Sequence, residues 1–257
     1  MEKYTENEIK AIKFYTGDVS GGDSFYGDGK AYVTLNSLFF EGIATEKMRA
    51  YEGKQLNPAV IENIPRLLEF FNSLFSAFGK SKLARPCKTY RVERMADFEM
   101  CRSLGRTISL TSTSLAGFLD EYRDRRGIAL MEFNLKEGTH CIDVAEVLDC
   151  YVKAEEREIL LPPFLSIDIV EKELTQAESC ITDCDGNPPF ISARVNVNGI
   201  SENVEDVDIH ICDCGSGIRV YNALNNGETP TEADIAEYSL WKKYMQKRLY
   251  SIISHYL

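Results

Sequence analysis

Residues 128–144, IALMEFNLKEGTHCIDV, carry the clearest strand signal of the chain. The first part, 128–135, is mostly apolar and has the length of a buried strand. The Lys-Glu-Gly that follows is typical of a turn, and 139–144 is a second short apolar segment. The sequence therefore predicts two successive strands joined by a turn.

Five further segments of the same kind lie on either side of this pair. Each is short and bounded by Gly, Pro or polar residues that favour turns. They are 88–93 (KTYRVE), 107–112 (TISLTS), 158–162 (EILLP), 165–171 (LSIDIVE) and 190–197 (FISARVNV). Residues 98–102 and 118–125 have the pattern of short intervening helices.

Residues 1–80 have a helical pattern instead. Thr5 and Glu8 have the spacing of a capping box, and apolar residues at helical spacing fill 61–78. Pro65 is expected to kink or divide that second helix.

A long helix is also predicted from about residue 232 to the end, capped by Thr231 and Asp234. The glycine-rich stretch 17–30 has no Gly-Lys-Ser/Thr ending, so it is expected to be a surface loop and not a phosphate-binding loop.

The composition is that of an ordinary globular protein, with 257 residues, 44% hydrophobic and 27% charged. No apolar run approaches the ~20 residues that span a bilayer. The charged N-terminal sequence MEKYTENEIKAIKFYTGD lacks the apolar centre of a secretory signal. We therefore expect a protein without a membrane partner, either cytoplasmic or delivered to a target cell by a route independent of a signal peptide.

The net charge of −11 is concentrated in one region. Residues 155–215 hold fourteen acidic and three basic residues, which equals the whole excess. An acidic surface repels phosphate backbones and argues against a nucleic-acid partner, although 80–94 could supply a local basic patch.

The eight cysteines have irregular spacing, which favours free thiols in a reducing compartment. Four of them, Cys180, Cys184, Cys212 and Cys214, could bind zinc together with His210. Because paired zinc ligands usually have two residues between them, buried thiols are the simpler interpretation. No catalytic metal is expected.

Three short segments place polar residues in or beside strand patterns. They are Tyr90-Arg91, Thr111–Leu115 (TSTSL) and Glu156–Pro162 (EREILLP). Singly, each has an ordinary explanation: a salt-bridged arginine, a Ser/Thr turn and an exposed pair of glutamates. Their order is more specific, because Ser-Thr-Ser follows the arginine by about twenty residues and Glu-x-Glu precedes an apolar strand and a proline.

This order resembles the mono-ADP-ribosyltransferases of the arginine–serine–glutamate type, such as the clostridial binary-toxin enzymes and the arginine-specific transferases. The resemblance covers about residues 85–172. It implies an α+β fold, a split β-sandwich around an NAD cleft, with N-terminal helices and a C-terminal helix. It further implies one domain over 1–257, with a helical segment over 1–80, a catalytic core over 85–172 and an extension over 175–257 of unassigned role.

The resemblance also implies NAD as the substrate that is cleaved. Arg91 can grip a phosphate with its planar fork of donors. Glu158 can stabilise the positive charge that develops on the ribose as nicotinamide leaves. Ser112 can orient that carboxylate, and Thr113 and Ser114 can shape the edge of the pocket.

A Glu at the first position of Glu-x-Glu goes with arginine as the acceptor in this family. Glu156 is expected to orient the acceptor guanidinium and take its proton. If 156 and 158 lie in one strand, their side chains point to the same side. Glu155 is the alternative for the acceptor role, and the strand phase favours Glu156.

Two positions depart from the family. The aromatic residue often found three positions before the first glutamate is replaced by Lys153, with Tyr151 two residues earlier. Many members have Gly after the motif arginine, where this chain has Val92 and Glu93. The acidic side chain of Glu93 has no place in the family pattern, and an alternative role for Arg91 is a structural salt bridge to Glu93 or Glu99.

The segment AGFLDEYRDRRG (116–127) falls where the resemblance places a loop that contacts phosphate and nicotinamide. Phe118 could stack on nicotinamide, and Arg123, Arg125 or Arg126 could meet a phosphate. The alternative is a charged amphipathic helix with Phe118 facing the core, which the periodicity favours for most of these residues.

The sequence thus predicts a monomeric transferase, a toxin or effector that moves ADP-ribose from NAD to an arginine of a target protein. The alternatives are an NAD glycohydrolase, a catalytically silent interaction protein of the same fold, and transfer to nucleic acid.

Overall fold

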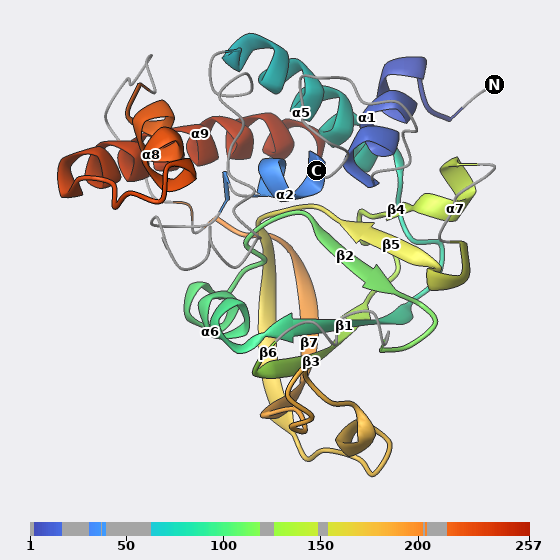
Figure 1. The fold of residues 1–257 in the computed structure, drawn as a ribbon. Helices are drawn as coiled ribbons and strands as arrows, with labels where there is room; N and C mark the ends of the chain where they lie inside the picture. The colour runs from blue at the N-terminus through green and yellow to red at the C-terminus, as the bar shows by residue number, and fades with distance from the viewer. Residues whose placement is uncertain are drawn as a thin grey trace. The chain divides into compact units, whose positions relative to one another are not determined.

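The computed structural model describes residues 3–16, 31–36, 38–39, 63–118, 126–148, 154–202, 204 and 215–257. These residues form two compact units, one from 1–77 with 204–256 and one from 78–203 (Figure 1). The predicted loop at 17–30 lies outside the described residues. The assignment of the whole chain to one domain with three segments stays a prediction.

The first unit is built from helices. They are α1 (Glu6–Thr16), α2 (Ala31–Asn36), α5 (Ile64–Lys80, which belongs to this unit up to Ala77), α8 (Gly215–Asn225) and α9 (Glu232–Tyr256). The capping box is confirmed, because Thr5 N donates to Glu8 Oε2 (2.7 Å) and Glu8 N donates to Thr5 Oγ1 (3.3 Å). Ser76 Oγ donates to the other oxygen of Glu8 at 2.7 Å and so ties α5 to α1.

Helix α9 starts at Glu232, where the sequence predicts it. Asp234 N donates to Thr231 Oγ1 at 3.1 Å, which confirms the cap of α9. Helix α5 runs unbroken from Ile64, so Pro65 lies in its first turn, where the missing N–H costs nothing, and not at an internal kink. Helix α8 was not predicted.

The second unit is a seven-stranded mixed sheet with short helices, so the α+β class is confirmed. The strands are β1 (Cys87–Arg94), β2 (Thr111–Ser114), β3 (Ile128–Leu135), β4 (Ile142–Asp143), β5 (Glu158–Leu161), β6 (Leu165–Lys172) and β7 (Ile191–Ile200). Their order is β4-β5-β2-β1-β3-β7-β6, and only β3 and β7 pair in parallel. The remaining elements are α6 (Met95–Leu104), α7 (Val144–Val147), η2 (Ala154–Glu156) and η3 (Glu178–Cys180).

Two predicted strands are displaced. The strand expected at 107–112 is formed by 111–114, so Thr-Ser-Thr-Ser is the strand itself and not its end. The strand expected at 139–144 is reduced to 142–143, because Asp143 caps α7 by accepting a hydrogen bond from Ala145 N (3.1 Å).

Alternation along the strands divides the apolar side chains between the two faces of this sheet. Met131 and Phe133 of β3 belong to a large buried cluster with Phe98 of α6 and with residues of β5 and β7. Val92 of β1 and Leu130 of β3 belong to a smaller cluster, against which Phe118, Leu174 and Ile181 pack. The halves β5-β2 and β1-β3-β7-β6 are joined by a single register pair, Tyr90 with Ser114.

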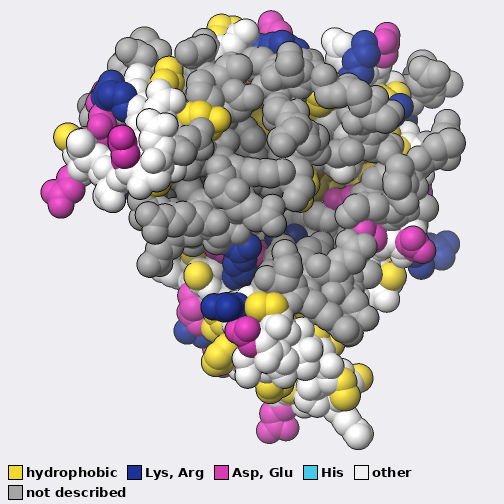
Figure 2. Space-filling model, viewed as in Figure 1, with side chains coloured by type: hydrophobic (Ala, Val, Ile, Leu, Met, Phe, Trp, Pro, Cys, Tyr) yellow, Lys and Arg dark blue, Asp and Glu magenta, His cyan; other side chains and the backbone are white. Residues whose placement is uncertain are grey.

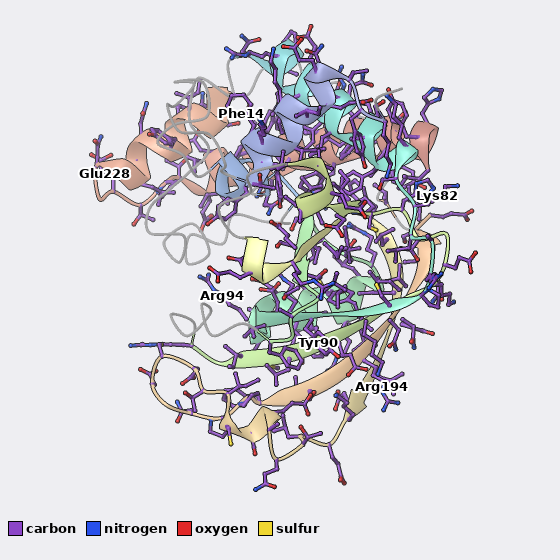
Figure 3. All side chains as sticks on the ribbon, turned by 90° about the vertical axis from the view of Figure 1, so that its right-hand side faces the viewer. Phe14, Lys82, Tyr90, Arg94, Arg194 and Glu228 are labelled. Carbon is purple, nitrogen blue, oxygen red and sulfur yellow. The ribbon has the colours of Figure 1, made fainter. Side chains whose placement is uncertain are left out.

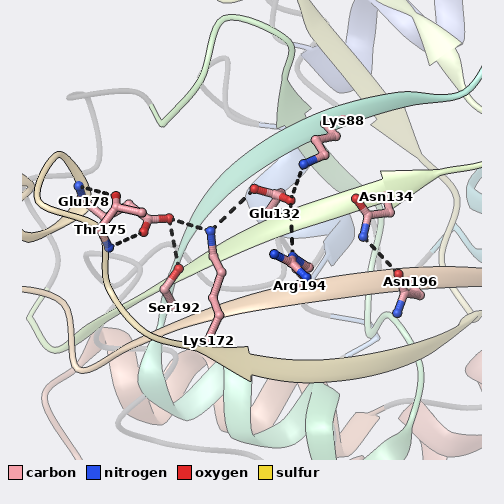
Figure 4. A network of polar contacts seen from close by, with 9 residues as sticks. All are labelled: Lys88, Glu132, Asn134, Lys172, Thr175, Glu178, Ser192, Arg194 and Asn196. Carbon is pink, nitrogen blue, oxygen red and sulfur yellow. Dashed lines mark hydrogen bonds and ion pairs between the residues drawn. The ribbon is translucent and has the colours of Figure 1, made fainter.

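A polar network crosses the face that carries the smaller cluster (Figure 4). Glu132 of β3 meets Lys88 at 2.9 Å and Lys172 at 3.5 Å, and Lys172 also meets Glu178 at 2.9 Å. Burial would raise the pKa of Glu178, but hydrogen bonds from Thr175, Lys172 and Ser192 outweigh it and hold that pKa at about 2. The network therefore fastens the connection between β6 and β7 to the sheet as paired charges.

The described residues contain no helix long and apolar enough to cross a membrane. Basic and acidic side chains lie interspersed on the face shown in Figure 2.

Candidate active site

The sheet brings the three motif segments together on neighbouring strands. Arg91 lies on β1, the Ser-Thr-Ser segment on β2, and Glu158 begins β5, with β2 between the other two. Strands β2 and β5 pair along their whole length, from Thr111 opposite Leu161 to Ser114 opposite Glu158. The paired strands β2 and β5 are more than forty residues apart in sequence and yet lie side by side.

Tyr90, Ser114 and Glu158 form one row across these three strands. Tyr90 is the register partner of Ser114, and Ser114 is the partner of Glu158. Directly opposite residues share a face of a sheet, so the three side chains leave on the same side. Ser114 and Glu158 are buried, with 3% and 6% of their surface exposed.

Ser114 holds the main chain that leads into β5. Its Oγ donates to the carbonyl oxygen of Glu156 at 2.6 Å and accepts from Ala116 N at 2.9 Å. Leu115 N donates to the carbonyl of Arg157 at 3.1 Å. These contacts fix a turn in which Arg157 has φ of 46°, a left-handed conformation that costs energy for a residue with a Cβ.

Glu156 reaches the site by a different route from the one predicted. It lies in the 3₁₀ helix η2, and β5 begins only at Glu158, so the alternation argument for Glu156 and Glu158 is wrong. The turn at Arg157 separates the two elements. Both carboxylates are nonetheless buried, with Glu156 at 8% exposure, whereas Glu155 is exposed.

Arg91 is held within the sheet rather than at a solvated edge. Its Nε meets Glu93 Oε2 at 2.5 Å, and its Nη1 donates to the Ser112 carbonyl at 2.8 Å. Because successive side chains alternate, Arg91 leaves β1 on the face opposite to Tyr90. The structure therefore links Arg91 to β2 through the main chain of Ser112 and does not place its guanidinium in the row that contains Glu158.

The remaining residues of the Ser-Thr-Ser segment differ in burial. The Ser112 side chain is half-buried, on the face of Glu158. Thr113 is buried on the other face, and its Oγ1 donates to the Ile159 carbonyl at 2.8 Å. Thr113 thus fastens β2 to β5, and Ser112 is the hydroxyl better placed to meet a ligand.

Phe118 is partly buried and packs against the smaller apolar cluster of this unit. Its ring meets Tyr90 edge to face at 5.1 Å, and it contacts the cluster around Val92 and Leu130. Figure 3 shows Tyr90 on the sheet of this unit, together with Arg194. The core-facing alternative therefore describes Phe118 in this structure.

The neighbouring basic residues are only partly described. Arg126 meets Asp185 at 3.2 Å, and Gly127 N donates to Asp183 Oδ2 at 3.0 Å. Arg123, Arg125, Tyr151 and Lys153 lie outside the described residues.

The predicted alternative of a zinc site involves residues that the structure describes only in part. Cys180 and Cys184 are exposed and free, and Cys212, Cys214 and His210 lie outside the described residues. Within the described ranges, no group of three or more His, Cys, Asp and Glu side chains could hold a metal ion.

One residue at the site, Tyr90, has no role predicted from the sequence, although it stands beside the motif arginine. Ser114, expected at the edge of the pocket, holds the main chain of Glu156 instead. Glu93 is two residues from Arg91, a spacing that puts both on one face of a strand. Together, the site offers two buried glutamates at the head of β5 and the half-buried hydroxyl of Ser112, groups suited to stabilising a cationic sugar, while the Arg91 guanidinium lies on the opposite face of the adjoining strand β1.

No protein-family model matches the sequence, and no curated protein matches it. Among solved structures, the chain is similar to the ADP-ribosylating toxin BECa of a binary enterotoxin of C. perfringens, crystallised with NADH (TM-score 0.48, 17% identity, 76% of this chain and 44% of that chain). It is also similar to Plx2a, an ADP-ribosyltransferase toxin from Paenibacillus larvae (TM-score 0.48, 17% identity, 76% and 88%). A third is an ADP-ribosyltransferase from Clostridium botulinum (TM-score 0.44, 17% identity, 75% and 87%). The chain spans less than half of BECa and most of the other two proteins.

Proposed function

We propose that this chain is a mono-ADP-ribosyltransferase that transfers ADP-ribose from NAD to an arginine of a target protein and releases nicotinamide. The observation that carries the proposal is the row formed by Tyr90, Ser114 and Glu158, with Glu156 held beside it by Ser114. The sheet unites the three segments whose order in the sequence first suggested this chemistry.

Glu158 takes the central role in cleavage of NAD. The bond between the ribose and nicotinamide breaks with its electron pair leaving on nicotinamide, so positive charge develops on the ribose. A buried carboxylate stabilises that charge more than one in water does. Ser112, half-buried on the same face two residues along β2 from Ser114, orients the carboxylate and contacts the nucleotide.

Glu156 serves the acceptor. A guanidinium is a poor nucleophile while protonated, so a carboxylate beside it must orient it and accept a proton as the new carbon–nitrogen bond forms. Glu156 is buried whereas its neighbour Glu155 is exposed, which supports Glu156 for this role.

Arg91, Thr113 and Phe118 support the proposed NAD site. Arg91 binds a phosphate of NAD through its guanidinium. Thr113 keeps β2 and β5 in register, and Phe118 packs edge to face against Tyr90, which lies in the row with Ser114 and Glu158. An enzyme of this kind would act as a toxin or effector on a protein of another cell.

The experiment is a nicotinamide-release assay with NAD, run with and without cell lysate, with Glu158→Gln as the inactive reference. Transfer predicts release that lysate accelerates, and mass spectrometry that finds ADP-ribose on arginine side chains. Release that lysate leaves unchanged would instead identify an NAD glycohydrolase. Absence of any release by the folded protein would overturn the proposal.

A further inference from the structure

Glu93 forms a close ion pair with Arg91 on a face of the sheet that is otherwise apolar at this point. Both side chains leave the same face of β1, and their strand partners on β3 are the buried Ala129 and Met131. Only 18% of the Arg91 side chain and 13% of the Glu93 side chain are exposed. Two charges largely removed from water must be paired to be tolerated.

The carboxylate of Glu93 is itself fixed at two points. Oε2 meets Arg91 Nε at 2.5 Å, and Oε1 accepts from the backbone N–H of Arg94 at 3.1 Å, where β1 ends and α6 follows. Its negative charge also reaches α6, where burial and then Glu93 raise the pKa of the Cys101 thiol to about 12. Glu93 is therefore an ordered part of the sheet and not a mobile surface acid.

The guanidinium of Arg91 is therefore held through two of its nitrogen atoms. Glu93 accepts from Nε, and the Ser112 carbonyl on β2 accepts from Nη1 at 2.8 Å. Two contacts from two strands determine the plane of a flat group, which one contact would leave free to rotate.

We propose that Glu93 is a positioning residue that sets the plane of the Arg91 guanidinium for phosphate binding. This inference rests on the proposed function, in which Arg91 binds NAD. Glu93 acts through Arg91 and does not itself meet the nucleotide. It lowers the cost of binding because the guanidinium is oriented before NAD arrives.

The test compares Glu93→Ala, Glu93→Gln and the wild type by calorimetric titration with NAD and by the KM and kcat of nicotinamide release. Glu93→Ala is expected to weaken NAD affinity about tenfold and raise KM in parallel, with kcat changed far less, as is typical for loss of an orienting partner. Glu93→Gln keeps an oxygen that accepts from Nε and should restore affinity to within about threefold of wild type. Glu99→Ala is the matched control, because Glu99 pairs with Arg102 at 2.9 Å on the exposed surface of nearby α6.

A melting curve is measured for each variant to show that it folds. If Glu93→Ala does not fold, Glu93→Asp replaces it, because that variant keeps the charge but has a side chain too short to contact Arg91 in the same way. In an Arg91→Lys background, Glu93→Ala should cause no further loss of affinity. Unchanged or tighter NAD binding by folded Glu93→Ala or Glu93→Asp would overturn the inference while the proposed function stands. Failure of the wild type itself to bind NAD would overturn the proposed function instead.

Discussion

Ser114 on β2 holds Glu156 in η2 by a 2.6 Å hydrogen bond from its hydroxyl to the main-chain carbonyl of Glu156. The same hydroxyl accepts from Ala116 N. One buried side chain thus connects the end of β2 to the turn at Arg157 that separates the two glutamates. The main chain of Glu156, the glutamate that we propose for the acceptor side, is therefore anchored by this hydroxyl.

Replacing Ser114 with alanine should therefore affect both stability and activity. The variant leaves a buried carbonyl without this donor, which should lower the free energy of unfolding by about 1–3 kcal/mol. Transfer to arginine should fall more than NAD hydrolysis, because Glu156 loses its anchor. Chemical denaturation and the two activity assays measure these effects. The control is Ser179→Ala, because the exposed hydroxyl of Ser179, in η3, donates only to the nearby carbonyl of Gln176. An unchanged ratio of transfer to hydrolysis would refute the anchoring role.

Glu158→Gln keeps the size of the side chain and removes its charge. Because Glu158 is assigned to the cationic ribose, nicotinamide release and transfer should both fall by roughly 100-fold or more. Glu137→Gln, in the exposed turn after β3, is the charge-matched control and should behave as wild type. Near-normal release by a folded Glu158→Gln variant would exclude this assignment.

Glu156→Gln should separate the two reactions. Transfer to arginine needs a group that orients the acceptor, whereas hydrolysis needs none, so transfer should fall at least about tenfold further than hydrolysis. The matched control is Glu155→Gln, since Glu155 shares η2 but is exposed. If Glu155→Gln produced the larger loss of transfer, the acceptor role would belong to Glu155.

The sequence predicted well those features that depend on local patterns. The apolar run at 128–135 is β3 to the residue, and the capping box at Thr5 and the cap at Thr231 form as expected. The order of the three motif segments also predicted that they meet, and they lie on the neighbouring strands β1, β2 and β5. Composition and periodicity alone do not predict which strands pair.

It failed where a side chain or a backbone conformation overrides the pattern. Arg157 has a left-handed conformation that no propensity favours for arginine, and the turn it makes keeps Glu156 out of β5. The sequence left two partners open for Arg91, a nucleotide phosphate and an acidic side chain such as Glu93, and the structure pairs it with Glu93.

Arg91→Lys should weaken NAD affinity by roughly 1.5–3 kcal/mol, because an ammonium cannot reproduce two parallel hydrogen bonds to a phosphate. Calorimetric titration with NAD measures the loss, and a melting curve on the same sample measures stability. A purely structural Arg91, which serves only to pair with Glu93 and Ser112, predicts a lower melting temperature with NAD affinity unchanged. That second result would remove Arg91 from the NAD site.

Glu178 should make the stability of the second unit depend on pH. Its pKa falls from an ordinary value near 4.5 to about 2 in the folded protein, so its contribution is present in full above pH 4.5 and is lost as the pH falls toward 2. Glu178→Gln removes hydrogen bonds from Lys172, Thr175 and Ser192 to a charged acceptor and should cost about 2 kcal/mol at neutral pH. Denaturation curves at pH 7, 5, 4 and 3 should therefore show the free energies of unfolding of wild type and variant converging at the acid end.

The control is Glu173→Gln, which removes an exposed carboxylate next to β6 and should show no dependence of this kind on pH. A difference between wild type and Glu178→Gln that stayed constant from pH 7 to pH 3 would show that the network in Figure 4 does not depend on the charge of Glu178.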